Sequence, residues 1–385
     1  MLLEVRGRPC ARSSAGAQHA DRVGNAVTNK TRLRILDAQI AQVLAFAWDD
    51  FAAMRKDSTH VEGNTEWPTD SHTLVALVAR VVRVGASLPR FSLPAIASPR
   101  VRDHLVAMAK LDREIALAPQ SKDRARRRRR SYQRLLWRAV RVRNILQEAV
   151  THVEKSLASL DVLPSRKAMA TRVAVRLRAD VDALAKVIEH CEARVIFEQK
   201  VPVAEKVLSV SDPDVGFIAK GQRAPVIGYK PQLARSGGGF ITGLLLPKGN
   251  ASDSGQLVPM FDEVVRRTTV TPSVVSVDDG YASKANADAI RERNVDVISI
   301  NGAKGYALTA RADWESEPYA DARCMRSAVE SLMFTLKQGF DFGYVARRGL
   351  DAAYGELIEK ALAYNTCRMA RRRHDALDPA YAAAA

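Results

Sequence analysis

Five acidic residues in the second half of the sequence have positions that suit metal-dependent chemistry. Asp212 and Asp214 follow a short apolar segment, Asp278 and Asp279 end another, and Glu330 falls inside a helical pattern. Carboxylates are hard oxygen ligands that suit Mg²⁺ or Mn²⁺. Two such ions, about 4 Å apart, can hold the attacking and leaving oxygens of a phosphoryl transfer. A single aspartate is more often a turn residue or a helix cap, so the interpretation depends on the whole set.

The segment around Glu330 carries the most specific pattern. Arg326, Glu330 and Lys337 are spaced R-x3-E-x6-K. At about 100° per residue, Glu330 lies about 40° and Lys337 about 20° from Arg326 on a helix, so all three share one face. Two cations beside a metal-binding carboxylate suit a DNA site, because they can hold phosphates on either side. The open alternative is a surface ion pair between Arg326 and Glu330.

The elements that must position these acids are predicted from residue 205 onward. Short apolar segments predict strands, and Ser236 with the three glycines at 237–239 predicts a hairpin. The expected order is three strands, then strands alternating with helices, which indicates a mixed sheet flanked by helices. Acids at the carboxyl ends of strands in such a sheet converge on one site. The predicted strands are 205–211, 226–234, 240–246, 273–277 and 295–300, the predicted helices are 256–267, 283–293, 322–338 and 350–373, and 301–320 is expected to be irregular.

The first half has a different texture. Apolar residues at helical spacing predict helices from Leu36 to Phe51, over 73–85, within 101–160 and from about 173 to 188, whereas 57–71 is polar and rich in turn residues. Residues 1–200 hold 36 Lys and Arg against 21 Asp and Glu, while the remainder holds 23 against 22. An excess of positive charge confined to one half favours a polyanionic partner.

An arginine-rich stretch is the clearest basic feature. Five consecutive arginines are expected to interrupt the helices of 101–160, since such a run cannot pack in a core. Three more follow on one face of the next helix. We interpret the run and the stripe as a track for the DNA phosphate backbone, with a solvated basic face as the alternative. The residues are Arg126, Arg127, Arg128, Arg129, Arg130, Arg134, Arg138 and Arg141.

The remaining composition excludes several classes of protein. The four cysteines show no metal-binding spacing, which fits buried thiols in a reducing cytoplasm. Residues 1–30 lack the apolar segment of a signal peptide. The most apolar stretch, 74–84, contains two arginines and is too short to cross a bilayer. We therefore expect a cytoplasmic protein with no membrane partner.

At residues 200–373 the sequence resembles bacterial insertion-sequence transposases of the DDE superfamily. The resemblance rests on a D-x-G-Y motif that selects Asp278 over Asp279, and on the R-x3-E-x6-K pattern that ends with Lys337. Where family members often carry tyrosine three residues before the arginine, this sequence has Arg323. The matching segments are SVSDPDVGFIAKG at 209–221, GYK at 228–230, VDDGYAS at 277–283, RSAVESLMFTLK at 326–337 and ARRGL at 346–350, together with Asn365 and Arg368.

The resemblance implies an α/β fold in which a helical basic N-terminal region precedes a ribonuclease H-like mixed-sheet catalytic domain. It implies a triad of Asp212, Asp278 and Glu330 that binds two Mg²⁺ or Mn²⁺ ions, with Asp214 as the alternative first acid. Arg326 and Lys337 would contact DNA. The implied reaction is cleavage at the ends of a mobile element and strand transfer into target DNA. The implied partners are double-stranded DNA, as terminal inverted repeats and target site, and a second copy of the chain in a homodimer, in a nucleoid-associated bacterial setting.

The predicted organisation is a disordered basic leader over 1–35, a helical DNA-binding region over 36–200, a catalytic domain over 201–373 and a tail over 374–385. Two alternatives remain for the activity. One is another ribonuclease H-like nuclease, such as a junction resolvase, which cuts DNA without joining it. The other is an inactive or repurposed transposase that only binds DNA.

Overall fold

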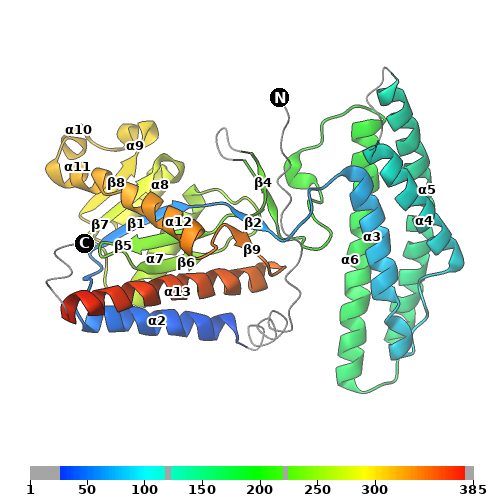
Figure 1. The fold of residues 1–385 in the computed structure, drawn as a ribbon, viewed down its shortest axis with the longest axis horizontal. Coiled ribbons are helices and arrows are strands. Elements are labelled where there is room, and N and C mark those ends of the chain that lie inside the picture. Colours follow the sequence, from blue (N-terminus) through cyan, green and yellow to red (C-terminus); the bar gives the residue numbers. More distant parts are fainter. Residues whose placement is uncertain (1–26, 118–122, 220–223, 378–385) are drawn as a thin grey trace. The chain divides into compact units, whose positions relative to one another are not determined.

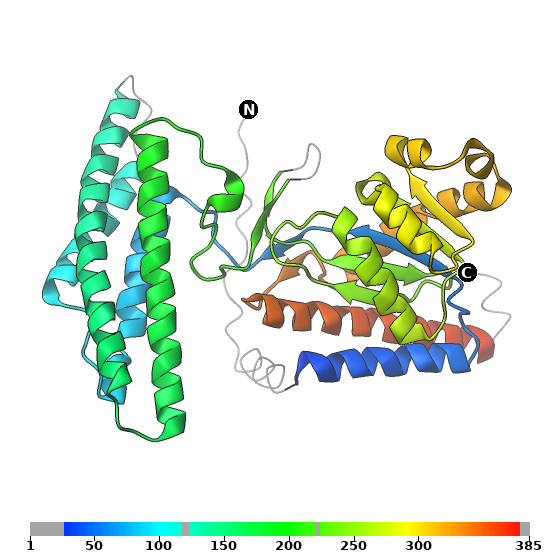
Figure 2. The ribbon, with the colours of Figure 1, turned by 180° about the vertical axis from the view of Figure 1, so that it is seen from behind.

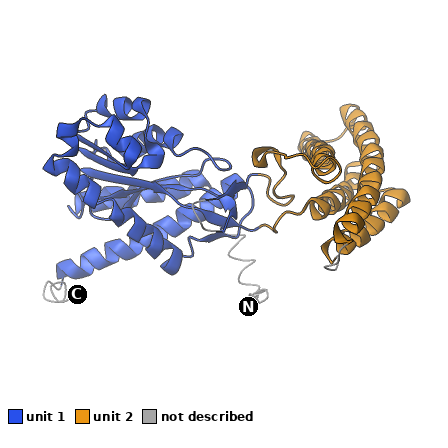
Figure 3. Cartoon of the chain, turned by 90° about the horizontal axis from the view of Figure 1, so that it is seen from above, with its two compact units in different colours: residues 1–64, 214–385 blue, residues 65–213 orange. Residues whose placement is uncertain are grey.

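The computed structural model describes residues 27–117, 123–219 and 224–377, and the chain in it forms two compact units (Figure 1). The first, here the sheet unit, comprises residues 1–64 and 214–385, and the second, the helical unit, comprises residues 65–213 (Figure 3). Most of the predicted leader and the last eight residues of the predicted tail lie outside the described residues. The first tail residues, from 374, continue a helix instead.

A five-stranded sheet is the centre of the sheet unit. Its strand order is β6-β5-β1-β7-β8. The pairs β6–β5 and β5–β1 are antiparallel, whereas β1–β7 and β7–β8 are parallel. This mixed sheet, flanked by helices, confirms the predicted α/β class and ribonuclease H-like arrangement. The strands are β1 Ala53–Ser58, β5 Gln232–Ser236, β6 Ile241–Leu245, β7 Val274–Asp278 and β8 Val297–Asn301.

The first strand was not expected where it lies. The polar sequence of β1, AMRKDS, contains none of the apolar alternation that indicates a strand, yet all of it but Ala53 is buried. It pairs with β5 on one side and β7 on the other, so residues 53–58 form the middle of the sheet. Residues 36–64 therefore belong to the sheet unit and not to the helical region that the sequence predicted.

A second, four-stranded sheet has the order β3-β4-β2-β9. Its strand β2 follows β1 after two residues, and β4 precedes β5, with a break at Lys230 and Pro231 in the predicted strand 226–234. The predicted strand 205–211 does not form. A 3₁₀ turn, Val203–Glu205, overlaps its first residue, and the chain after it is irregular. The four strands are β2 Val61–Gly63, β3 Gly216–Ile218, β4 Val226–Tyr229 and β9 Tyr344–Val345.

Helices cover both faces of the five-stranded sheet (Figures 1 and 2). On one face α7 and α8 enclose an apolar core that includes Met54, Val275 and Val277. On the other, α11 contacts β7 and β8 while α12 contacts β1 and β5. The long α13 packs beside α2. Bounds are α2 Asn29–Ala45, α7 Leu257–Thr268, α8 Lys284–Arg291, α9 Ala303–Leu308, α10 Arg311–Trp314, α11 Glu317–Cys324, α12 Ser327–Gly339 and α13 Leu350–Leu377.

Three of these helices occupy 301–324, mostly inside the segment 301–320 that was expected to be irregular. They are short, and α11 begins with Glu317 and Pro318, a common arrangement at a helix start. Helices as short as these contain too few turns for a helical periodicity to be recognised in the sequence. The structure thus corrects that expectation.

The helical unit is an antiparallel bundle with a mostly apolar core, in which Arg80 and the buried Asp180 form an ion pair at 3.0 Å. The predicted helix 73–85 is present as part of α3, whose Thr69 side chain caps the first turn. The arginine run, expected to interrupt the helices, instead forms the first turns of α5, where all five side chains are exposed. Because these side chains are exposed, the run does not have to pack in a core, which was the reason for expecting a break in the helix. Bounds are α3 Asp70–Gly85, α4 Pro99–Ala116, α5 Arg124–Ala158 and α6 Pro164–Val195.

Within the described ranges, no helix combines the length and apolar character that crossing a bilayer requires.

Candidate active site

Two aspartates lie side by side at the carboxyl ends of central strands. Strands β1 and β7 pair in parallel, with Ala53 opposite Val274 and Arg55 opposite Ser276. The same register, continued by two residues, puts Asp57 opposite Asp278. Opposed residues on adjacent parallel strands point to the same face of a sheet. Asp57 and Asp278 therefore share one face and one edge.

The face they share is the one covered by α11 and α12. Arg55, two residues before Asp57 and so on the same face, places Nη2 2.8 Å from the Met325 sulfur. Ser276, two residues before Asp278, donates from Oγ to the Ala322 carbonyl at 2.9 Å. The alternate residues Met54 and Val277 lie in the core on the opposite face. The two carboxylates consequently point toward the side of the sheet where Glu330 is found.

Glu330 lies on α12, which is anchored by its apolar stripe. Val329, Leu332 and Leu336 are buried, whereas the Glu330 side chain is 56% exposed. Its Oε1 accepts a hydrogen bond from Nη2 of Arg326 at 2.6 Å, so the i,i+4 ion pair that was the alternative interpretation does form. Lys337, which lies on the same face of the helix as Arg326 and Glu330, is half-buried.

Asp278 and its neighbour Asp279 have different partners. Oδ1 of Asp278 accepts only a local hydrogen bond from the Gly280 amide at 3.0 Å. Both carboxylate oxygens of Asp279 accept from backbone amides at the start of α9, Gly305 at 2.9 Å and Lys304 at 3.2 Å. Asp279 thus caps a helix, which is consistent with selecting Asp278 as the site acid.

The two acids predicted for the first position have other surroundings. Asp212 is buried in the helical unit, follows no strand, and its amide donates to Ser209 Oγ at 3.0 Å. Asp214 forms an ion pair with Lys248 at 3.0 Å and accepts from the Leu350 amide at 3.1 Å, at the start of α13. Burial raises the pKa of Asp214, but these hydrogen bonds outweigh it and hold that pKa below its usual value. The strand-end argument that selected Asp212 therefore selects Asp57 in the structure.

Asp57 was missed because the sequence around it looks like a turn. The segment Asp57–Ser71 is polar, and no apolar strand precedes it. In the strand, residues 53, 55 and 57 lie on one face and residues 54, 56 and 58 on the other. That alternation is hidden because Lys56, although charged, points into the interior.

Lys56 lies in a buried polar cluster on the opposite face of the sheet. Its Nζ is 2.7 Å from Gln232 Oε1 and 3.6 Å from the centre of the Tyr281 ring. Burial lowers the pKa of Lys56 to about 7, although the carboxylates of Asp253, Asp57 and Asp278 act in the opposite direction. Tyr281 donates to the same Gln232 oxygen at 2.6 Å, and burial raises the pKa of its hydroxyl. The tyrosine of the D-x-G-Y motif thus anchors the strand end that carries Asp278.

Asn365 and Arg368 bind the hairpin between β5 and β6. The Asn365 side chain accepts from the Ile241 amide and donates to the Ile241 carbonyl, both at 2.9 Å. Arg368 donates from Nε to the Gly238 carbonyl at 2.7 Å. Both residues thereby satisfy backbone groups at an edge of the sheet.

The arginines predicted to bind DNA differ in their contacts. Arg134 is 3.9 Å from Glu114, and Arg138 donates to His104 at 3.3 Å. Arg141 stacks on exposed Trp137, with its guanidinium carbon 4.0 Å from the ring centre. Within the run at 126–130, Arg129 is held by the Ile196 carbonyl at 2.8 Å.

In the parts of the chain that the structure describes, no three His, Cys, Asp or Glu side chains approach closely enough to form a metal cluster. Asp57, Asp278 and Glu330 do offer an all-oxygen donor set on one face, which is the set that Mg²⁺ and Mn²⁺ select. The donor chemistry fits these ions. Their binding would require the Glu330 carboxylate to leave Arg326.

Comparison with known families finds a transposase domain in the second half of the chain. Residues 198–366 match the family model described as the transposase DDE domain. No curated protein and no solved structure matches the chain. The fold and the matched segment define a ribonuclease H-like domain of the transposase class. Residues 198–366 are a DDE-superfamily transposase domain, which supports a transposase in general.

The matched segment starts after the helical unit has almost ended. It contains Asp278 and Glu330 but not β1, and so not Asp57. A search for the first acid confined to this segment finds Asp212 or Asp214. The structure adds the missing strand from residues 53–58.

Proposed function

We propose that the chain catalyses DNA cleavage and strand transfer with Asp57, Asp278 and Glu330 as its metal-binding acids. The observation that carries the proposal is the parallel register of β1 and β7, which sets Asp57 and Asp278 level at one strand end. Asp57 takes the position for which the sequence suggested Asp212 or Asp214. Glu330 completes the set from α12, which packs against β1.

Two Mg²⁺ or Mn²⁺ ions would supply a nucleophile at neutral pH and stabilise the charge that develops on the phosphoryl oxygens. The carboxylates of Asp57 and Asp278 hold fixed positions, because each belongs to a strand in the middle of the sheet. A rigid placement matters because phosphoryl transfer depends mainly on positioning and electrostatic stabilisation. Water attack at the element end frees a 3′-hydroxyl, which then attacks the target strand.

Arg326 and Lys337 are proposed to contact DNA phosphates beside the acids. Arg326 is the partner of Glu330 at 2.6 Å. Glu330 would hold the metal ion through its carboxylate, and the Arg326 guanidinium would then be available to pair with a DNA phosphate. The helical unit is proposed to bind DNA through its basic surface, and a homodimer would hold two element ends.

The test uses duplexes with the DNA sequences that flank the gene on each side, incubated with Mg²⁺ and wild-type chain, Asp278→Ala or Glu330→Gln. Wild type is expected to give 3′-hydroxyl ends and joined products, and both variants are expected to give neither. Equal activity in wild type and variants would overturn the proposal. Cleavage without joining identifies a nuclease of the resolvase type, and binding without cleavage identifies a DNA-binding protein.

A further inference from the structure

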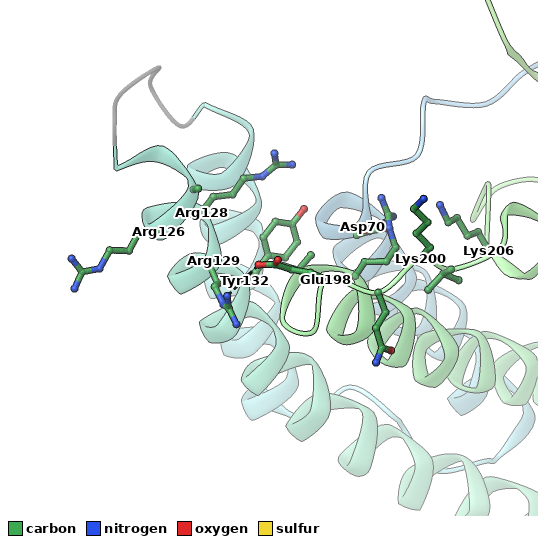
Figure 4. Close-up of a pocket in the computed structure, with 13 residues that line it drawn as sticks. Asp70, Arg126, Arg128, Arg129, Tyr132, Glu198, Lys200 and Lys206 are labelled. Carbon is green, nitrogen blue, oxygen red and sulfur yellow. Dashed lines mark hydrogen bonds and ion pairs between the residues drawn. The ribbon is translucent and has the colours of Figure 1, made fainter.

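The helical unit contains a hollow of about 850 Å³ that the proposed chemistry does not use (Figure 4). Its walls come from the first turns of α5, the carboxyl end of α6 and the chain that follows α6 to Lys206. Most of the ionisable side chains that line it are basic. Those used below are Arg128, Arg129, Arg194, Lys200 and Lys206.

Two of the arginines in its wall have partners that fix them. Arg194 donates to both carboxylate oxygens of Asp70 at 2.7 Å, which ties α6 to α3. Arg129 donates to the Ile196 carbonyl at 2.8 Å and lies 3.5 Å from Glu198. These contacts neutralise the two charges and hold the walls of the hollow together.

Three cations at the mouth are not neutralised in this way. Arg128, Lys200 and Lys206 form no ion pair with any residue in the described ranges. Figure 4 shows Arg128 extending beside Tyr132 toward the side on which Lys200 and Lys206 end, whereas Arg126 points away. The guanidinium carbon of Arg128 is 5.7 Å from the centre of the Tyr132 ring.

The opening of the hollow lies in a region of excess positive charge. Helix α5 begins with a run of arginines and has no acidic residue in its first turn. Positive side chains at the positive end of a helix dipole cost stability. The whole helical unit holds 28 Lys and Arg against 16 Asp and Glu, so 12 of the 16 excess charges belong to it. A bound anion would relieve this repulsion.

We propose that the mouth of this hollow binds the phosphate backbone of duplex DNA, with Arg128 on one wall and Lys200 and Lys206 on the other. DNA as the polyanion rests on the proposed function. The hollow is larger than a single phosphate requires, and its three unpaired cations come from separate segments, which suits successive phosphates of a strand. Arg128 is then the member of the arginine run that acts here, and Lys200 and Lys206 are partners that the charge pattern did not single out.

The experiment measures binding of a fluorescent duplex of arbitrary sequence to the full-length chain at several KCl concentrations. The variant is Arg128→Gln/Lys200→Gln/Lys206→Gln. Its matched control is Lys110→Gln/Lys155→Gln/Arg172→Gln, which removes the same charge from exposed positions of the helical unit away from the hollow. Circular dichroism melting checks that both variants fold.

We expect the triple variant of the hollow to bind about tenfold to a few hundredfold more weakly near 0.1 M salt. The slope of its log affinity against log salt concentration should be shallower by the amount that about three lost phosphate contacts produce. The control is expected to bind within about threefold of wild type, because it leaves the phosphate contacts intact. Wild-type binding by the triple variant of the hollow, or equal losses in both variants, overturns the inference. Asp278→Ala separates the two proposals: if it and wild type bind the duplex through this site but neither cleaves, only the proposed activity fails.

Discussion

The two units of this chain bury charged side chains to different extents. The helical unit has a mostly apolar core with an ion pair between Arg80 and the buried Asp180, and its arginine run at 126–130 is wholly exposed. The sheet unit brings Lys56, Asp57 and Gln232 into its interior. Buried polar groups are costly unless hydrogen-bonded, so they mark places where function constrains the sheet. The contrast separates a unit suited to contact a polyanion from one suited to do chemistry on it.

The largest effect expected from this contrast is on catalysis. Asp57→Asn should reduce DNA cleavage at least about a thousandfold, because it removes a carboxylate from the proposed metal site. Asp212→Asn, in the helical unit, should cleave within about threefold of wild type, since it lies outside the proposed metal site. A single-turnover cleavage assay with Mg²⁺ compares the two. Loss of activity in Asp212→Asn with activity kept in Asp57→Asn would reverse the assignment.

The thiol of Cys191 reports on the helical core. Burial raises its pKa to about 12 from the ordinary 9.0, so near neutral pH its thiolate fraction falls about a thousandfold. A variant that keeps only Cys191 should therefore react with a thiol reagent far more slowly than one that keeps only the exposed Cys324. In the folded state its rate should keep rising up to about pH 12. A plateau near pH 9 instead would show that the thiol reacts from an opened state.

The next effect concerns stability within one unit. Leu135 is completely buried in the bundle, so Leu135→Ala should destabilise the helical unit by about 2–5 kcal/mol. Val106→Ala, at a position 71% exposed, should change stability by less than about 0.5 kcal/mol. Native-state hydrogen exchange locates the change. Equal loss of protection in the sheet strands would show that the units unfold together.

The smallest effect tests the edge of the sheet. Asn365→Ala leaves the Ile241 amide and carbonyl without their side-chain partner, at a cost of about 1–3 kcal/mol. Cys367→Ala, two residues along the same helix and exposed, is the control. Urea unfolding followed by tryptophan fluorescence measures both. An unchanged Asn365→Ala midpoint would mean that water replaces the side chain at this edge.

The sequence predicted the parts of the molecule whose patterns are local. Helix α3, the hairpin β5–β6 and the strand ending at Asp278 follow from periodicity, glycines and apolar runs, and all are present. Glu330 lies in α12, within the segment 322–338 that was predicted to be helical. These features depend on residues that are near each other in the chain, so local sequence patterns were sufficient to predict them.

The parts that it missed depend on distant segments. Strand β1 is stabilised by pairing with β5 and β7, about 180 and 220 residues away in the register, and nothing within AMRKDS itself indicates a strand. Asp57 was consequently assigned to a turn, and the first acid was sought near Asp212. Lys56 shows why: its charge suggests exposure, but Gln232 and Tyr281 enclose it.

The chain leaves the four-stranded sheet for the helical unit and returns to it at neighbouring points. Strand β2 ends at Gly63 and β3 begins at Gly216, and both pair with β4, where Glu62 and Gly216 each lie opposite Gly228. Two strands on either side of a third are about 10 Å apart. A linker of a few residues could therefore join them in place of residues 65–213. The sheet unit would accept an inserted unit of different length at this point without a change in the register that aligns Asp57 with Asp278.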